Sequence, residues 1–188
     1  MRKIYYLKPV FNFILIGLLI LTFNRIFLFI IFNERVVETP NYFQLFSIGI
    51  RFDLILLCYL SFLPFVLLTV LPNTILNRIK KFFNFYFIFF LFLILLMELA
   101  TLDFINQYDT RPNRLFLDYL IYPKEVVGTL LKSYLPSLII TTILLGIALF
   151  YAFKYGKKVF YPIESNYKIK LLLFSVVAFL LFFGARGS

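Results

Sequence analysis

The chain has 188 residues, of which 62% are hydrophobic and only 15% are charged, and its formal net charge is +10. Soluble domains contain about 45–50% apolar and about 25% charged residues, so a mean hydropathy of +0.93 excludes a water-soluble globular fold. Each membrane-spanning helix needs roughly 20 mostly apolar residues. We therefore expect an all-α membrane protein that crosses the bilayer several times.

Five apolar runs are candidate membrane spans, where the backbone must form its hydrogen bonds within each segment. The last two are short for a span, and flanking Tyr and Lys residues can extend them into the membrane interfaces. We expect spans at residues 10–32, 52–71, 82–100, 137–154 and 169–185, in one membrane domain over residues 1–188. The first run follows Arg2 and Lys3, as in a signal peptide. It is longer than the roughly 7–15 apolar residues of a cleavable signal, and no small-residue cleavage site follows it. We interpret it as an uncleaved anchor.

The basic residues predict the orientation of these spans. With a cytoplasmic N-terminus, eleven lysines and arginines fall on the cytoplasmic side, together with a single acidic residue, Glu164. Seven fall on the outer side with nearly all the acids, as the positive-inside rule expects. Five spans then place the C-terminus outside. The charge follows the membrane topology, so we predict no nucleic-acid partner. General attraction to anionic lipid is a sufficient explanation for the cytoplasmic set, which includes Lys80, Lys81, Lys157 and Lys158.

Residues 101–136, between the third and fourth spans, form the outer segment with most polar residues. Pro112 suits the first position of a short helix, and Pro123 would end that helix and begin a second. The second helix would have an apolar face made of Val127, Leu130, Leu131 and Tyr134. The pattern is typical of a helix in the membrane surface. We therefore predict two short interfacial helices, with a simple connector as the alternative.

The chain contains no histidine and one cysteine, Cys58. An imidazole base, a histidine-ligated metal and an internal disulfide are therefore excluded. We interpret Cys58 as a small buried hydrophobe. We predict no catalytic residue, no metal site and no cofactor in this chain.

Three ionisable residues fall inside the predicted spans at similar outer depth. Arg25 lies about two-thirds along the first span, Asp53 in the first turn of the second and Glu98 in the last turn of the third. A charge at such a depth is costly unless it is paired or faces water. We predict that Arg25 pairs with Asp53 or Glu98, with Arg51 nearby at the surface. The group is either an ion pair that orients the helices or a polar pocket for a phospholipid headgroup.

Several short motifs together resemble one family. They are Gly49-Ile-Arg-Phe-Asp53, Tyr108-Asp-Thr-Arg-Pro-Asn-Arg-Leu-Phe116, Asp118-Tyr-Leu120, Tyr122-Pro-Lys-Glu-Val126 and Gly184-Ala-Arg-Gly-Ser188. At these positions the chain resembles the membrane domain of lipoteichoic acid synthases and their relatives. These sulfatase-fold transferases move phosphoglycerol or phosphoethanolamine from phospholipid to a glycan or glycolipid. The resemblance covers essentially the whole chain.

The resemblance implies a multi-pass protein of the bacterial cytoplasmic membrane that anchors an extracellular catalytic domain and positions its lipid. That domain, with its Thr nucleophile and its Mn or Mg ion, would follow residue 188, so the family's catalytic residues match no position here. We expect this chain to be inert alone, with the bilayer, anionic phospholipid and that domain as its partners. The candidate headgroup residues are Arg25, Arg51, Asp53, Glu98, Arg111, Arg114 and Lys124. The candidate residues for contact with the catalytic domain are Tyr119, Tyr122 and Glu125.

The alternative is a small stand-alone membrane protein, such as a transporter subunit or a scaffold for envelope assembly. Transporters typically place polar residues at the bilayer midplane and interrupt their helices. In this sequence the ionisable residues of the spans share one outer depth, and Pro64 is the only proline well inside a span. Both features favour the lipid-positioning interpretation over transport.

Overall fold

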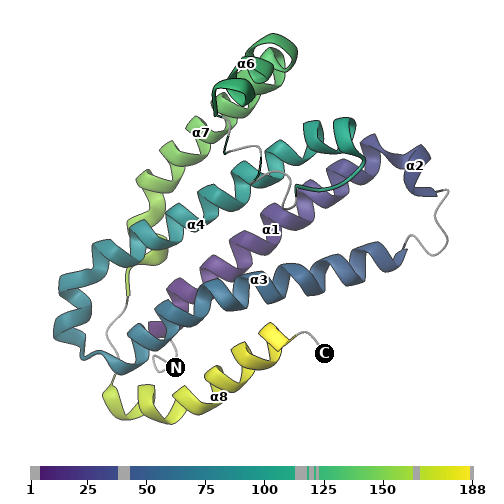
Figure 1. Ribbon diagram of the computed structural model, residues 1–188. Helices are drawn as coiled ribbons and strands as arrows, with labels where there is room; N and C mark the ends of the chain where they lie inside the picture. Colours follow the sequence, from purple (N-terminus) through teal and green to yellow (C-terminus); the bar gives the residue numbers. More distant parts are fainter. Residues whose placement is uncertain are drawn as a thin grey trace.

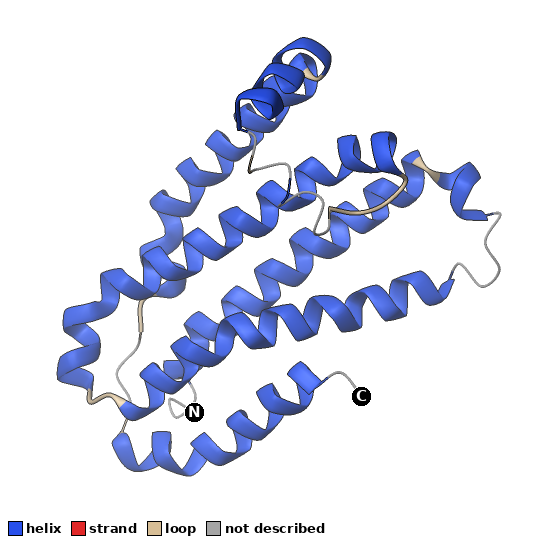
Figure 2. Ribbon diagram, viewed as in Figure 1, coloured by secondary structure: helices blue, strands red, loops and turns tan. Residues whose placement is uncertain are grey.

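The structure, a computed structural model, describes residues 5–37, 43–112, 118, 121, 123–162 and 166–186. Nearly all of these residues are helical, and none of them lies in a strand (Figure 2). After a 3-10 turn at Tyr5–Leu7, the helices are α1 (Lys8–Ile31), α2 (Asn33–Val37), α3 (Phe43–Val70), α4 (Asn73–Tyr108), α6 (Pro123–Ser133), α7 (Leu135–Phe160) and α8 (Tyr167–Arg186). The predicted all-helical fold is confirmed.

Four helices, α1, α3, α4 and α7, are long and apolar enough to cross a membrane. They indicate a multi-pass membrane protein. The apolar part found in helix α8, Leu173–Arg186, is shorter than the four long helices. A fifth span at α8 therefore stays a prediction.

The long helices pack side by side in the order α7, α4, α1, α3 and α8 (Figure 1). Helix α1 is central, because it contacts α3 on one side and α4 on the other. At one end, which we call the lysine end, the N-terminal turn, the start of α4, the end of α7 and the start of α8 come together (Figure 1). The other end, which we call the Arg25 end, contains the end of α1, the start of α3 and the end of α4.

Aromatic packing is concentrated toward the lysine end. The ring centroid of Phe87 lies 5.0 Å from that of Phe13 and 5.2 Å from that of Phe160, which joins α4 to α1 and α7. Phe65 of α3 stacks on Phe174 of α8 with 5.6 Å between centroids. Toward the Arg25 end, α1 and α3 diverge (Figure 1), although the ring centroid of Phe29 of α1 still lies 5.4 Å from that of Phe46 of α3.

The helices extend beyond the predicted spans, because a helix continues until a residue breaks it and does not stop at the membrane surface. Helix α3 begins at Phe43, so Asp53 lies about three turns inside it and not in its first turn. Helix α4 has no internal Gly or Pro and continues to Tyr108, so Glu98 likewise lies about three turns before its end. The helix ends at Asp109, which has a left-handed conformation with φ of 52°, three residues before Pro112.

The segment at 101–136 differs in part from its prediction. Residues 101–108 belong to the last two turns of α4 and are not an interfacial helix. The first predicted short helix, between Pro112 and Pro123, lies mostly outside the described residues. The second is present as α6, which begins at Pro123 as predicted and leaves Val127 and Leu131 half exposed.

Candidate functional site

A buried ion pair joins α1 to α3 where the two helices begin to diverge. The Arg25 Nη2 atom lies 2.7 Å from Asp53 Oδ2, and the exposed fractions of the two residues are 8% and 6%. The predicted pairing of Arg25 is therefore present, with Asp53 as its partner. The second guanidinium nitrogen, Nη1, is also buried, and it has no hydrogen-bond partner among the described residues.

Gly49 makes room for this ion pair. It lies one turn before Asp53 on the same face of α3, because residues i and i+4 of a helix are neighbours. A Cβ atom added at Gly49 would lie 2.4 Å from both Cζ and Nε of Arg25. The guanidinium therefore crosses the α3 backbone in direct contact with it, which only a residue without a side chain permits.

Glu98 of α4 is held on the other side of α1. The Asn24 amide donates to the Glu98 carboxylate and also to its backbone carbonyl, at 3.2 Å. Arg111 Nη1 lies 3.9 Å from Glu98 Oε1, at the outer limit of an ion pair. Because Asn24 and Arg25 are adjacent, the four groups Asn24, Arg25, Asp53 and Glu98 share one level of the bundle, as the sequence predicts for its three ionisable members.

A second ion pair lies at the Arg25 end of the bundle. Arg35 Nη1 of α2 lies 2.7 Å from Asp109 Oδ1, the residue that ends α4, and both side chains are largely exposed. The Arg35 guanidinium also lies 5.5 Å from the centre of the Phe32 ring. The pair connects the end of α1 to the end of α4 and so fixes the start of the segment that carries Arg111.

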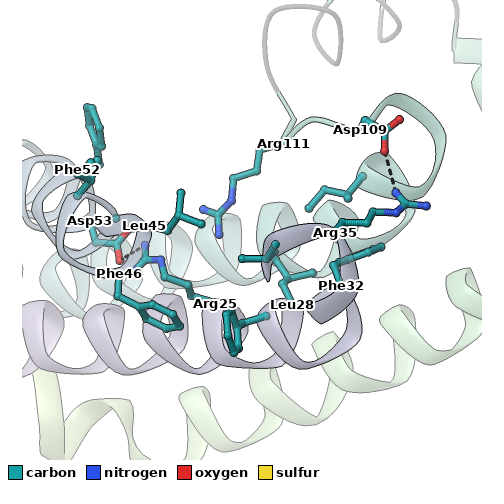
Figure 3. A pocket seen from close by; sticks show the side chains of 15 residues that line it. Arg25, Leu28, Phe32, Arg35, Leu45, Phe46, Phe52, Asp53, Asp109 and Arg111 are labelled. Atoms are coloured by element: carbon teal, nitrogen blue, oxygen red, sulfur yellow. Dashed lines mark hydrogen bonds and ion pairs between the residues drawn. The ribbon is translucent and has the colours of Figure 1, made fainter. Parts of the chain in front are cut away.

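These groups surround a cavity of about 620 Å³ between α1, α2, α3 and the end of α4 (Figure 3). Its volume is within the roughly 300–1,000 Å³ of small-molecule sites. In Figure 3 the guanidinium end of Arg111 points into the space between the two ion pairs. The rest of the lining is mostly apolar and includes Leu28, Phe29, Phe32, Leu45, Phe46, Ile48 and Phe52.

The charges of the lining favour an anion. Three arginines and two aspartates line the cavity, so its formal charge is positive. Each aspartate is already paired with one arginine. The donor group that remains for a ligand is the loosely held guanidinium of Arg111. Nη1 of Arg25 has no hydrogen-bond partner among the described residues, but it is buried and not open to the cavity. Arg25 would therefore favour an anion in the cavity through its positive charge, and Arg111 through a direct hydrogen bond.

The structure brings only some of the candidate headgroup residues together. Arg25, Asp53 and Arg111 line the cavity. Glu98 is not among the lining residues, but its carboxylate lies 3.9 Å from Arg111 Nη1. Arg51 is exposed on α3, but it lies two residues from Asp53 and so faces away from Arg25. Lys124 is exposed on α6 and is not among the lining residues. Arg114 lies outside the described residues.

The candidate residues for contact with a catalytic domain are hardly described. Tyr119 and Tyr122 lie outside the described residues, and of Glu125 only the backbone, in the first turn of α6, is described. Helix α6 itself packs on α7 at the Arg25 end (Figure 1). Docking at this surface stays a prediction.

Sequence reasoning missed Arg35 and Asp109. They are 74 residues apart, so no spacing rule connects them, and each on its own is typical of a solvated helix end. In the sequence, Gly49 stands out only as part of the motif Gly49-Ile-Arg-Phe-Asp53. Its role follows from a contact between two helices, which no local pattern shows.

No family model matches this chain, and no solved structure matches it. The resemblance to lipoteichoic acid synthases therefore stays a prediction. Within the described part of the chain, no three His, Cys, Asp or Glu residues come together as a metal site. The chemistry of the Arg25 cavity must be inferred from its own side chains.

Proposed function

We propose that this chain is the membrane-anchoring and lipid-positioning domain of a phospholipid-headgroup transferase of cell-envelope glycan or glycolipid synthesis. In this function the Arg25 cavity holds the phosphate of a phospholipid. The observation that carries the proposal is a cavity lined by both Arg25 and Arg111, whose other walls are mostly apolar.

The lining fits a phospholipid better than a free anion. Arg25 contributes its positive charge and Arg111 offers donors for phosphate oxygens, and hydrogen bonds between charged partners are the strong ones. Leu45, Ile48 and Phe52 on α3 line the same cavity and are 50%, 49% and 64% exposed. In a membrane, these exposed apolar side chains would face lipid, so a ligand with a charged head and apolar chains could use both parts of the site.

Lipid positioning by the anchor would make the transfer reaction faster. A headgroup held at one site replaces a bimolecular encounter with a local one, which lowers the barrier to transfer. In the proposed topology the N-terminus is cytoplasmic, α8 is the fifth span, and the Arg25 end faces the outer side. A catalytic domain that follows residue 188, with its Mn or Mg ion, would then meet the headgroup there, and this chain alone would be inert.

The lipid-binding part is tested by native mass spectrometry of the detergent-purified chain. Phosphatidylglycerol is compared with a diacylglycerol that has the same acyl chains but no phosphate. A charge-assisted hydrogen bond corresponds to about a tenfold gain or more in affinity, so one phosphatidylglycerol per chain should be retained preferentially.

The matched variants identify the site. The double substitution Arg25→Met with Asp53→Leu removes both charges together and should abolish that preferential retention. Lys132→Gln, at an exposed lysine of α6, should leave it unchanged. Equal retention of the two lipids by the wild-type chain, or unchanged retention by the double variant, would contradict the proposal.

The anchoring part is tested separately by topology. A reporter enzyme that is active only outside the cytoplasm is fused after Ser188, and a second fusion is made after Pro72, in the connection between α3 and α4. The proposal predicts activity for the first fusion and none for the second. An expressed but inactive Ser188 fusion would exclude an extracellular catalytic domain after this residue.

A further inference from the structure

A second cavity, of about 280 Å³, lies between α1, α4 and α7 on the side of the bundle away from α3. Its lining comes from all three helices and is almost wholly apolar. The residues that matter for the argument are Ile20, Ile88, Phe92, Ala152 and Tyr155. This cavity shares no lining residue with the Arg25 cavity.

Small residues on one face of α7 create this cavity. Gly156 permits close contact with α4, because an added Cβ would lie 2.5 Å from Asn84 Oδ1 and 2.9 Å from Ile88 Cδ1. One and two turns earlier on the same face, Ala152 and Ala148 are too short to fill the space that opens as α7 leaves α4. The result is an open groove between α1, α4 and α7.

Two lysines lie close to this groove by their positions on α4 and α7, although neither is among its lining residues. Lys81 lies on the same face of α4 as Ile88, two turns closer to the lysine end, and Lys158 follows Tyr155 by one turn on α7. Both are exposed. The acidic residues of the described helices lie elsewhere, in α2, in the first half of α3, in the second half of α4 and in α6.

We infer that this groove binds one acyl chain of an anionic phospholipid, whose phosphate lies between Lys81 and Lys158. The apolar lining matches the chain, and the two uncompensated lysines match the phosphate. Tyr151 and Tyr155, which are stacked with 6.2 Å between ring centroids, border the groove at the depth where aromatic rings favour the lipid interface. The inference does not depend on the proposed function, because it concerns other helices and the opposite end of the bundle.

General attraction between lysines and an anionic membrane surface is the competing explanation, and adjacent residues separate the two. Lys80 and Lys157 neighbour Lys81 and Lys158 in sequence but are turned about 100° around their helices. The Nζ atom of Lys80 instead lies 5.7 Å from the centre of the Tyr161 ring, directly after α7. The double variants Lys81→Gln/Lys158→Gln and Lys80→Gln/Lys157→Gln change the net charge equally, and only the first removes the two proposed phosphate ligands.

The test is native mass spectrometry with phosphatidylglycerol and with phosphatidylcholine of the same acyl chains. Each lysine near a phosphate contributes about a fivefold factor in affinity, so the first double variant should lose one phosphatidylglycerol with about 25-fold weaker retention. The second double variant should retain it. The Arg25→Met/Asp53→Leu variant should also retain this lipid, so the failure of one site is distinguishable from the failure of the other.

A filling substitution tests the acyl-chain part without a change in charge. Ala152→Phe should occupy the groove and release the same lipid, whereas Gly146→Phe, at a position with open space around it, should not. Thermal unfolding of each variant confirms that it is folded. Equal loss in both lysine doubles, equal retention of phosphatidylcholine, or unchanged retention in Ala152→Phe would overturn the inference.

Discussion

Arg25 and Lys170 are both buried cations, and they lie at opposite ends of the same bundle. Lys170 is 1% exposed, its Nζ donates to Asn73 Oδ1 at 2.8 Å, and it lies 5.7 Å from the centre of the Tyr6 ring. Arg25 is 8% exposed, but it lines a cavity of about 620 Å³ and retains a nitrogen without a partner.

The comparison shows that burial of a charge does not by itself make a binding site. The Lys170 cluster joins the N-terminal turn, the start of α4 and the start of α8, and its amine is enclosed by protein. Arg25 also joins two helices, but it lines an open cavity together with a second arginine, Arg111. We therefore expect substitutions at Lys170 to affect stability alone, and substitutions at the Arg25 site to affect both stability and lipid retention.

Asp53→Asn should cause the largest loss of stability. Removal of one partner leaves Arg25 buried and uncompensated, which should lower the free energy of unfolding by about 3–5 kcal/mol. Denaturation of the purified protein in detergent measures this loss. The double variant Arg25→Met/Asp53→Leu should recover most of it, and a double variant as unstable as Asp53→Asn would argue against an uncompensated charge as the cause.

Lys170→Met should cost about 1–3 kcal/mol, because it removes a buried hydrogen bond to Asn73. The same denaturation assay checks this value, with Lys154→Met at an exposed position as the matched control. Retention of phosphatidylglycerol at the Arg25 cavity should be unchanged. A folded Lys170→Met protein that loses this lipid would show that the two cations do not differ as we describe.

Gly49→Ala should cost about 1–3 kcal/mol through overpacking against the Arg25 guanidinium, and it should also weaken lipid retention. Gly146→Ala is the control, since nothing lies near its added Cβ. It should stabilise its helix by up to about 1 kcal/mol. If the two alanine variants behave alike in both assays, the contact between Gly49 and Arg25 is unimportant.

The smallest effect is expected for Asp109→Asn, which breaks the exposed pair with Arg35. Exposed pairs contribute about 0–1 kcal/mol, so the unfolding midpoint should hardly change. Arg111 follows this pair directly, so we expect a modest loss of lipid retention with nearly wild-type stability. A loss as large as that of Asp53→Asn would mean that the exposed pair is as important as the buried one.

The sequence predicts those features that follow from the cost of placing groups in lipid. Long apolar runs require helices, and a charge at the depth of Arg25 requires a partner, so the helical fold was predictable, and so was a pair of Arg25 with either Asp53 or Glu98. The ends of the helices were harder to predict from the sequence, because hydropathy marks the apolar part of a helix and not its whole length. Residues 101–108 were therefore assigned to an interfacial segment and not to α4.

The two cavities could not be predicted, because each depends on how helices diverge. The first opens where α1 and α3 separate beyond Gly49, and the second where Ala152 and Ala148 leave space against α4. The contact between Arg35 and Asp109 depends on the same divergence. These features are set by side-chain size at a few crossing points, which only the packed bundle shows.

Photo-cross-linking tests the central claim, a phospholipid phosphate at Arg25, most directly. A photoreactive benzoylphenylalanine is placed at Phe46, which lines the Arg25 cavity, or at Phe62, an exposed position on the same helix. The membranes contain phospholipid labelled with radioactive phosphorus. We predict that labelling at Phe46 falls in the Arg25→Met/Asp53→Leu background, whereas labelling at Phe62, which would face bulk lipid, does not change. A Phe46 signal that persists without Arg25, or an equal fall at the two positions, would contradict the account.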